Sequence, residues 1–385
     1  MIGNYDLWLC HWNGTRLAYL DSFIELDYTR ALGAVGALVL RMPSSFDVNL
    51  LQTDYKIEIW RGTKTLSSRL ENVYLLRGWR KEQDDTGVDS VVLVGLDGND
   101  ILNWRTVVGN TDSSYIRKTG LGGNILRAYM RAAIASTTGS GIGMTAQRDD
   151  IAAYFAVASD VSEWSAYSGA DPSSSFTKNY MGKTLFEVAE GICGTSAGRG
   201  YPLYWRVEPL SRSLYRFVVY APLAGQDRSA SIIVRPDNGM VTPVHEYDVS
   251  EELTICWGAG RDYGDGDGRQ LARAWDNIRN KRTPFSYHER FVDGGSEQYS
   301  ALLERIKDEL ADEDNLPRET FNCQINNVAG LEYMLDWDLG DRLGFQYRGL
   351  DETAVVMNAH VEIDENKAEK IYTSFEIEPE LEITG

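Results

Sequence analysis

The chain has 385 residues, of which 57 are acidic and 38 basic, so its formal net charge is −19. Proteins that bind nucleic acid present a basic surface to the phosphates, and the acidic composition of this chain does not favour such a surface. An acidic wall can still surround DNA, because repulsion lets a duplex slide without sticking. The length exceeds one ordinary core, and two to four domains are expected. The 21 Tyr and 10 Trp favour β structure and interfaces.

The cysteines are widely scattered and none forms a C-x-x-C pair; they are Cys10, Cys193, Cys256 and Cys323. This spacing indicates neither a zinc module nor a redox pair. Buried free thiols are favoured, and disulfides stay open as the alternative. The N-terminal segment has neither the basic nor the apolar region of a signal peptide, and no window approaches the ~20 apolar residues of a membrane span. Synthesis in the cytoplasm is therefore expected.

Residues 1–108 are expected to form an almost all-β domain. Residues 5–12 alternate in polarity and lead into Asn13-Gly14, a strong hairpin signal. Residues 31–40 are the least polar stretch of this region and end before Pro43. Their small side chains fit a sheet crossing or a close subunit contact, and equally an ordinary core strand.

The middle of the chain changes in texture. Residues 125–135 and 184–193 have the apolar spacing of helices, with Gly194 expected to end the second. Residues 136–180 are rich in Ser, Gly, Ala and Asp and predict loops or a loosely structured insertion.

Strand patterns return after residue 200, interrupted by one clear helix at 296–312 with Ser296 as its expected N-cap. The fold class expected is α+β, mainly β. The expected division of the chain is 1–108 for a first β domain, 109–200 for an α/β insertion, 201–258 with 321–385 for a second β domain, and 259–320 for a loop and helix insertion.

One pattern occurs near each end of the chain. An Asp, an Arg and a Gly recur at one spacing around an alternating strand, and in both copies a second alternating run, an acidic turn and a third run follow. The anchors are Asp54, Arg61 and Gly62 in the first copy, and Asp341, Arg348 and Gly349 in the second. The pattern predicts a duplicated antiparallel unit, through which three chains would present six similar surfaces. A chance similarity between two meanders is the alternative.

Candidate chemical motifs fail on their context. Residues 194–198 fit G-x-S-x-G around Ser196, but a helix precedes the motif and a strand follows, the reverse of a hydrolase elbow. A flexible helix-to-strand loop is the better interpretation. The glycine-rich stretches at 120–123 and 139–143 complete no phosphate-binding motif.

The acidic loop with Asp262, Asp265 and Asp267 has the oxygen ligands that calcium favours, but its spacing does not match an EF-hand. A solvated acidic loop is favoured there. The four histidines are isolated, and His288-Glu289 has no partner that sequence can identify. The sequence predicts no enzyme, no metal site and no cofactor.

Several segments, in order over most of the chain, resemble siphophage tail proteins of the baseplate-hub type. They are residues 5–43, 55–60, 91–105, 253–260 with Arg269, 286–290, 339–343 and 359–364. Residues 136–180 match nothing in that pattern, and no fibre or peptidoglycan-cleaving domain follows the second β domain.

The resemblance implies two tube-like antiparallel β-barrel domains per subunit and a homotrimer that forms a pseudo-sixfold ring. Such a hub joins the sixfold tail tube, or a distal tail protein, to the threefold tip, fibre or receptor-binding protein in the virion. Phage DNA passes through its lumen without specific binding, and contact with the host envelope is a further expectation. The side chains expected at tube-forming subunit surfaces are Leu32, Val35, Leu38, Ile57, Ile59, Leu343, Phe345 and Tyr347.

Three other functions remain open at this stage. A carbohydrate- or receptor-binding module of a tail or cell surface would use the many aromatic residues. A tail-borne hydrolase would use Ser196, His288 or Glu289. The spike-base protein of a contractile injection system would share the hub architecture.

Overall fold

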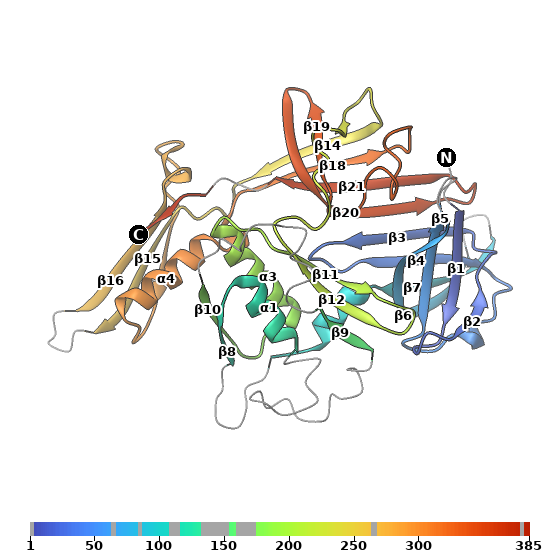
Figure 1. Ribbon diagram of the computed structural model, residues 1–385, viewed down its shortest axis with the longest axis horizontal. Coiled ribbons are helices and arrows are strands. Elements are labelled where there is room, and N and C mark those ends of the chain that lie inside the picture. The colour runs from blue at the N-terminus through green and yellow to red at the C-terminus, as the bar shows by residue number, and fades with distance from the viewer. Residues whose placement is uncertain are drawn as a thin grey trace.

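The computed structural model describes residues 4–62, 67–83, 87–107, 116–131, 154–158, 175–262, 268–377 and 381–385. One sheet dominates it, with thirteen strands in the order β14-β18-β21-β20-β3-β4-β7-β6-β5-β1-β2, while β19 and β13 branch from β20 (Figure 1). Within the described ranges, no helix is long and apolar enough to cross a membrane.

This sheet consists of two β units. The first β unit comprises β1 (Asn4–Cys10), β2 (Arg16–Tyr19), β3 (Glu25–Ala31), β4 (Ala37–Pro43), β5 (Lys56–Gly62), β6 (Arg69–Gln83) and β7 (Asp89–Leu96). The second β unit comprises β13 (Ile233–Val234), β14 (Met240–Asp248), β18 (Arg318–Ile325), β19 (Arg342–Tyr347), β20 (Leu350–Ile363) and β21 (Glu369–Ile377). The mainly β fold class is thus confirmed, but the expected closed barrels are not formed. The sheet path is open, with β14 and β2 at its two ends.

Both β units share one hydrophobic core, which is why they form a continuous layer. Leu7, Tyr28 and Tyr74 of the first unit are buried in the same cluster as Phe345 and Phe375 of the second. Burial of such aromatic side chains removes large apolar areas from water and supplies much of the driving force for folding.

The apolar segment at 31–40 divides into a turn and a strand. Ala31 ends β3, Gly33 has φ of +64°, and β4 begins only at Ala37. A Cβ on Gly36 would lie 2.2 Å from the carbonyl oxygen of Thr29, so only glycine fits this crossing of the chain. The hairpin at Asn13-Gly14 is formed as expected, and the N–H of Gly14 donates to the carbonyl of His11.

The middle unit lies against the first β unit. It comprises β8 (Ile116–Gly120), α1 (Gly122–Met130), β9 (Phe155–Val157), β10 (Phe176–Tyr180), α3 (Leu185–Gly198), β11 (Tyr204–Pro209) and β12 (Tyr215–Tyr220). The strand β12 pairs with both β11 and β9 in a separate sheet, whereas the sequence grouped residues 201–258 with the second β domain. Their inward side chains join the core of α1 and α3.

The helix α3 continues through residues 194–198, so the prediction of its end at Gly194 is wrong. Thr184 caps its start in a capping box with Glu187. A Cβ on Gly198 would lie 2.1 Å from the Cβ of Ala311, which shows that this glycine allows close helix contact. Gly198 is therefore explained by tertiary packing rather than by a need to end the helix.

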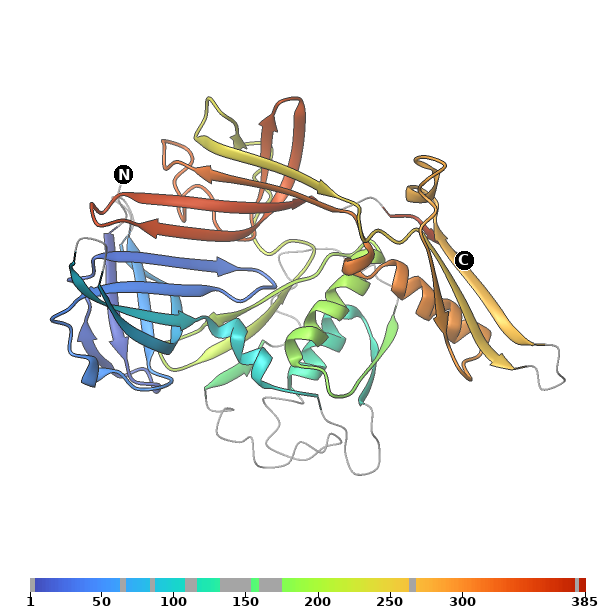
Figure 2. The ribbon, with the colours of Figure 1, turned by 180° about the vertical axis from the view of Figure 1, so that it is seen from behind.

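The arm is a separate unit that projects from one end of the molecule (Figures 1 and 2). It comprises β15 (Ile255–Asp262), β16 (Arg269–Asp276), β17 (Glu289–Asp293), α4 (Tyr299–Leu310) and β22 (Ile383–Thr384). The helix predicted at 296–312 is present, but its N-cap is Gln298 rather than Ser296.

The arm sheet has one covered and one open face. The helix α4 packs so closely on the covered face that a Cβ on Gly258 would lie 2.8 Å from Leu302. The opposite face leaves Trp257, Leu271 and Phe291 exposed.

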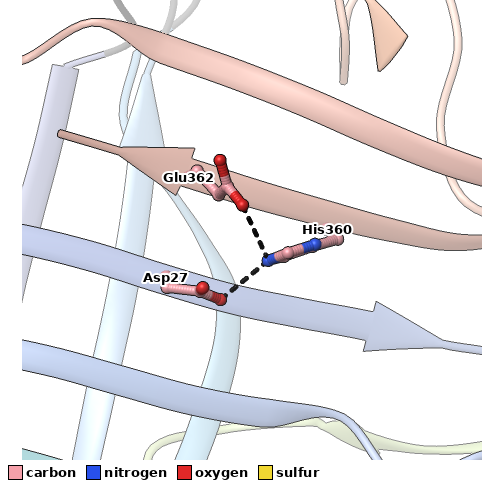
Figure 3. A group of neighbouring side chains, drawn as sticks. All are labelled: Asp27, His360 and Glu362. Carbon is pink, nitrogen blue, oxygen red and sulfur yellow. Dashed lines mark hydrogen bonds and ion pairs between the residues drawn. The ribbon is translucent and has the colours of Figure 1, made fainter. Parts of the chain in front are cut away.

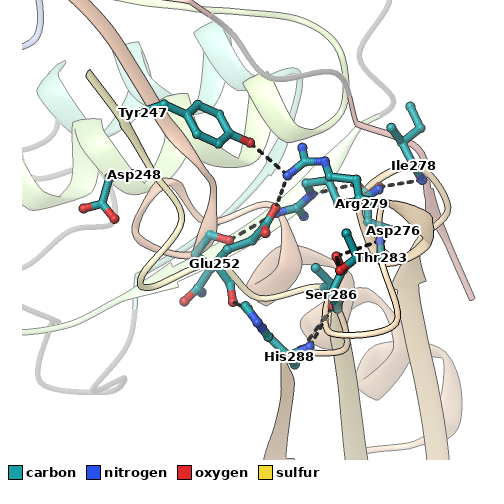
Figure 4. A network of polar contacts seen from close by, with 12 residues as sticks. Tyr247, Asp248, Glu252, Asp276, Ile278, Arg279, Thr283, Ser286 and His288 are labelled. Atoms are coloured by element: carbon teal, nitrogen blue, oxygen red, sulfur yellow. Dashed lines mark hydrogen bonds and ion pairs between the residues drawn. The ribbon is translucent and has the colours of Figure 1, made fainter. Parts of the chain in front are cut away.

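A polar network joins the arm to the end of β14 (Figure 4). Arg282 donates to the hydroxyl of Tyr247 at 3.0 Å and to Glu252 at 3.1 Å. Glu252 also lies 3.7 Å from the guanidinium of Arg279, which is fully buried and paired with Asp276 at 3.1 Å. These paired buried charges fix the base of the arm.

Candidate interaction edges of the sheet

The two β units repeat the same strand pairings. Leu75 of β6 pairs with Leu96 of β7, and Val355 of β20 pairs with Glu376 of β21. Both counterparts lie 280 positions later, as 355 minus 75 and 376 minus 96 show. Each middle strand also has a bulge at the equivalent place, at 76/78 in β6 and 356/358 in β20. A shared register and a shared bulge show that the meander is duplicated.

The sequence anchors of this repeat are only partly equivalent. Asp54 and Gly340 both have positive φ, +64° and +88°, and occupy the turn that precedes β5 and β19. Asp341 is therefore one residue out of step with Asp54, and that part of the predicted alignment is wrong. A bulge in the β5–β6 pairing then shifts the alignment by one residue, so that Arg61 and Arg348 are counterparts.

The duplication extends to four strands. Along the sheet, β14-β18-β21-β20 is followed by β3-β4-β7-β6, the same order of equivalent strands. The last strand of the second unit, β20, pairs antiparallel with the first strand of the first unit, β3. We call this contact the internal junction. It shows how one unit joins the next.

A histidine and two carboxylates lie across the internal junction (Figure 3). The Nε2–H of His360 on β20 donates to Asp27 on β3 at 2.8 Å, and Glu362 lies 3.9 Å away. The hydrogen bond to Asp27 raises the pKa of His360, although partial burial opposes the change. These three residues have a donor set that a transition metal accepts. The hydrogen bond accounts for their proximity without an ion.

A buried ion pair also links the two units. Arg61 of β5 and Glu369 of β21 are both 2% exposed, and their side chains approach to 2.9 Å. Arg61 also donates to the hydroxyl of Tyr5 and to the carbonyl of Tyr333, and Asn327 donates to Glu369. Because every partner is hydrogen-bonded, the charges are tolerated in the interior.

A polar pocket of about 230 Å³ lies where both β units meet the middle unit. Arg30 donates to Asp338 at 2.9 Å and to the hydroxyl of Tyr333 at 2.6 Å on one side of it. Burial raises the pKa of Asp97, another lining residue, to about 8. Arg30 and Asp338 join the two β units, so the pocket belongs to the region of the internal junction.

The counterparts of the internal junction are two open edges. Within the described ranges, β14 pairs only with β18, and β6 has no strand beside residues 78–83 on the side away from β7. Aromatic side chains on these edges are unusually exposed: Trp79 is 45% exposed and Tyr247 is 52% exposed. Ala359, the counterpart of Trp79 at the internal junction, is fully buried. Unpaired edges with exposed aromatic residues indicate an interaction surface.

The comparison with protein families identifies the chain. Residues 7–375 match the family described as Siphovirus ReqiPepy6 Gp37-like protein. The chain belongs to this family. Comparison with curated protein sequences finds no significant match.

Solved structures show that this Gp37-like protein has the fold of phage tail proteins. The 43 kDa tail protein of prophage MuSo2 from Shewanella oneidensis matches with a TM-score of 0.59 and 11% identity, covering 97% of this chain and 98% of that one. A tail protein from Neisseria meningitidis MC58 matches with a TM-score of 0.55, 11% identity and 97% coverage of both chains. Prophage tail protein gp18 from Listeria monocytogenes EGD-e matches with a TM-score of 0.52 and 9% identity, covering 96% and 94%.

The structure places most of the predicted subunit-surface side chains in the interior. Six are buried in the core of the Gp37-like chain, namely Leu32, Leu38, Ile57, Ile59, Leu343 and Phe345. Val35 and Tyr347 are half-buried. In this arrangement the six side chains stabilise the sheet from within, and the assignment of their strands to subunit contacts stays a prediction.

The residues considered for chemistry have structural partners. The buried hydroxyl of Ser196 donates to the carbonyl of Tyr201 at 2.7 Å. The ring of His288 bonds the carbonyl of Glu252, and Glu289 accepts from the indole of Trp257.

The candidate acidic loop is described only in part. Asp262 ends β15, opposite Arg269, while Asp265 and Asp267 lie outside the described residues. Residues 139–143 and most of 136–180 also lie outside them.

Sequence reasoning did not identify the pairing of β20 with β3 or the open edges. A signal was present in the constant spacing of 280 residues between the two meanders, which a register alignment of residues 75–96 and 355–376 would reveal.

Neutralising Glu369 with Glu369→Gln should destabilise the fold by about 3 kcal/mol, because Arg61 then stays buried without its counter-charge. Urea unfolding checks this. The exposed pair Arg318–Asp314 provides the control, and Asp314→Asn should change stability by no more than about 0.5 kcal/mol. Equal effects of the two variants would contradict a structural role for the junction pair.

The internal junction should weaken as pH rises. A histidine whose folded pKa is raised contributes stability below its unfolded pKa of about 6.5 and loses that contribution as pH passes through the folded value. His360→Gln should therefore cost more stability at pH 5.5 than at pH 8.5, by about 0.5 kcal/mol after allowance for solvent screening. In an Asp27→Asn background the difference between the two pH values should shrink, because only Glu362, 3.9 Å away, is then left to raise the pKa of His360. An undiminished difference in that background would contradict the pairing.

Proposed function

We propose that this protein is a structural component of the siphovirus tail tip, a baseplate hub in which three copies form a ring. The four-strand repeat carries the proposal. Two equivalent units per chain allow three chains to present six equivalent surfaces. Such a ring suits a sixfold partner on one side and a threefold partner on the other. The match to a siphovirus family and the fold of phage tail proteins support this role.

In this proposal the ring joins the tail tube, or a distal tail protein, to the tip, fibre or receptor-binding protein. The arm extends away from the two β units (Figure 2). Its open face with Trp257, Leu271 and Phe291 offers apolar surface to a partner. Apolar patches of this kind are typical of protein contacts. In this role the protein is part of the assembled virion and contacts the host envelope.

The charge of the chain supports a channel for DNA. A net charge of −19 repels a duplex, so DNA could leave through the ring without being held.

A structural role also fits Ser196 and His288, whose polar atoms form hydrogen bonds with the backbone of the chain.

The mass of the assembled protein tests the proposal. Native mass spectrometry should find a species of three times 43.2 kDa, and the same stoichiometry should hold in purified virions. A monomer or a hexamer in both preparations would contradict the hub.

A carbohydrate- or receptor-binding role is the second candidate, and the exposed Trp257 and Phe291 on the arm favour it. Flat aromatic rings on an open sheet could stack on sugar rings. On a glycan array, specific binding that Trp257→Ala abolishes and Trp104→Ala, at an exposed tryptophan outside the arm, leaves intact would favour this role. No binding would leave the hub as the function supported.

A further inference from the structure

We infer that the open edge of β6 in one copy pairs antiparallel with β14 of the next copy, in the register of the internal junction. This inference rests on the proposed ring and specifies which strands close it. The partner is a second copy of this chain, because the chain already contains the same contact between its own two units.

The register follows from the equivalent strands. Leu38 of β4 pairs with Gly95, and Phe321 of β18 pairs with Phe375, 280 positions after Gly95. Leu38 and Phe321 are therefore counterparts. Their partners on the preceding strands, Tyr28 of β3 and His245 of β14, are counterparts as well.

At the internal junction, Val361 of β20 lies opposite Tyr28 of β3. The residue 280 positions before Val361 is Lys81, so Lys81 of one copy lies opposite His245 of the next. The antiparallel ladder then places Arg80 opposite Glu246.

The next pair in this ladder is Trp79 with Tyr247, the two exposed aromatic residues of the edges. Directly opposed aromatic side chains stabilise a sheet by roughly 0.2–1 kcal/mol per pair. Pairing would also satisfy the backbone N–H and C=O groups that both edges leave to solvent.

The charges of the two edges are complementary. The open part of β6 carries Arg80, Lys81 and Glu82, a net charge of +1, although Arg80 also pairs with Glu82 at 2.7 Å. The acidic residues of β14 are Glu246 and Asp248. Like charges would oppose pairing of β6 with another β6, so the edges favour a heterologous, head-to-tail contact. Contacts of that type close into a ring when the rotation allows it.

The buried ion pair of the internal junction has a counterpart between copies. Arg348 is equivalent to Arg61, and the residue 280 positions before Glu369 is Asp89. Both Arg348 and Asp89 are exposed in the single chain. The repeat therefore places Arg348 of one copy near Asp89 of its neighbour, with the same signs of charge as Arg61 and Glu369.

Disulfide trapping in the full-length protein tests the register. Mild oxidation of an Arg80→Cys, Glu246→Cys double variant should give covalent dimers and trimers on a non-reducing gel, because directly opposed residues bring their Cβ atoms to about 4.5–5.5 Å. Each single variant should stay uncrosslinked. So should the Arg80→Cys, Tyr247→Cys pair, in which a shift of one residue points the thiols to opposite faces.

Native mass separates this inference from the proposed function. A trimer by mass, combined with no crosslink in the Arg80→Cys, Glu246→Cys variant, would overturn the edge pairing and leave the hub intact. A crosslinked open polymer would support the pairing and overturn the trimer. A crosslink from these positions to another tail protein, in place of a second copy, would overturn the inference.

A charge exchange provides a second test that does not depend on thiol geometry. Arg348→Glu and Asp89→Arg should each raise the dissociation constant of the trimer at least about tenfold, and the double variant should restore much of it. Arg290→Glu, an exposed substitution on the arm and away from both edges, should have no such effect. Additive losses in the double variant would overturn the placement of this pair.

Discussion

Backbone hydrogen bonding across the internal junction determines how the rest of this protein is arranged. A sheet edge leaves a row of N–H and C=O groups without partners, and each unit satisfies one such edge with the other. The contact of β20 with β3 joins segments from opposite ends of the chain into one sheet with one core. The middle unit is inserted between the two β units, and the arm is formed by an insertion between β14 and β18 together with β22 after β21, so both project from the sheet without interrupting it (Figure 1).

Buried charges make this contact specific. Hydrophobic packing alone would tolerate a sliding of one unit along the other, since apolar attraction has no direction. Arg61 with Glu369, and Arg30 with Asp338, bond only in one register, because displaced partners would leave buried charges unpaired. Two ion pairs at separate points of the same region therefore fix both the position and the angle of the units.

Local features of the fold could be predicted from sequence, and features that depend on distant residues could not. The Asn13-Gly14 turn and the helix α4 are encoded by a dipeptide and by a 3.6-residue period. The course of α3 through Gly198 depends on Ala311, a contact that no local pattern reveals. The mismatch between Asp54 and Asp341 comes from a bulge, which shifts register by one residue without a sequence signature. The open edges depend on which strands pair, and the apolar periodicity of a strand does not reveal which distant segment it pairs with.

The central claim is that the chain uses its internal junction as the pattern for contacts between copies. A reconstruction of the assembled particle by electron cryomicroscopy tests it most directly. The account predicts three copies around a channel, with β6 of each copy hydrogen-bonded antiparallel to β14 of the next and Arg80 opposite Glu246. A particle in which β6 and β14 stay unpaired, or pair with a different protein, would contradict it.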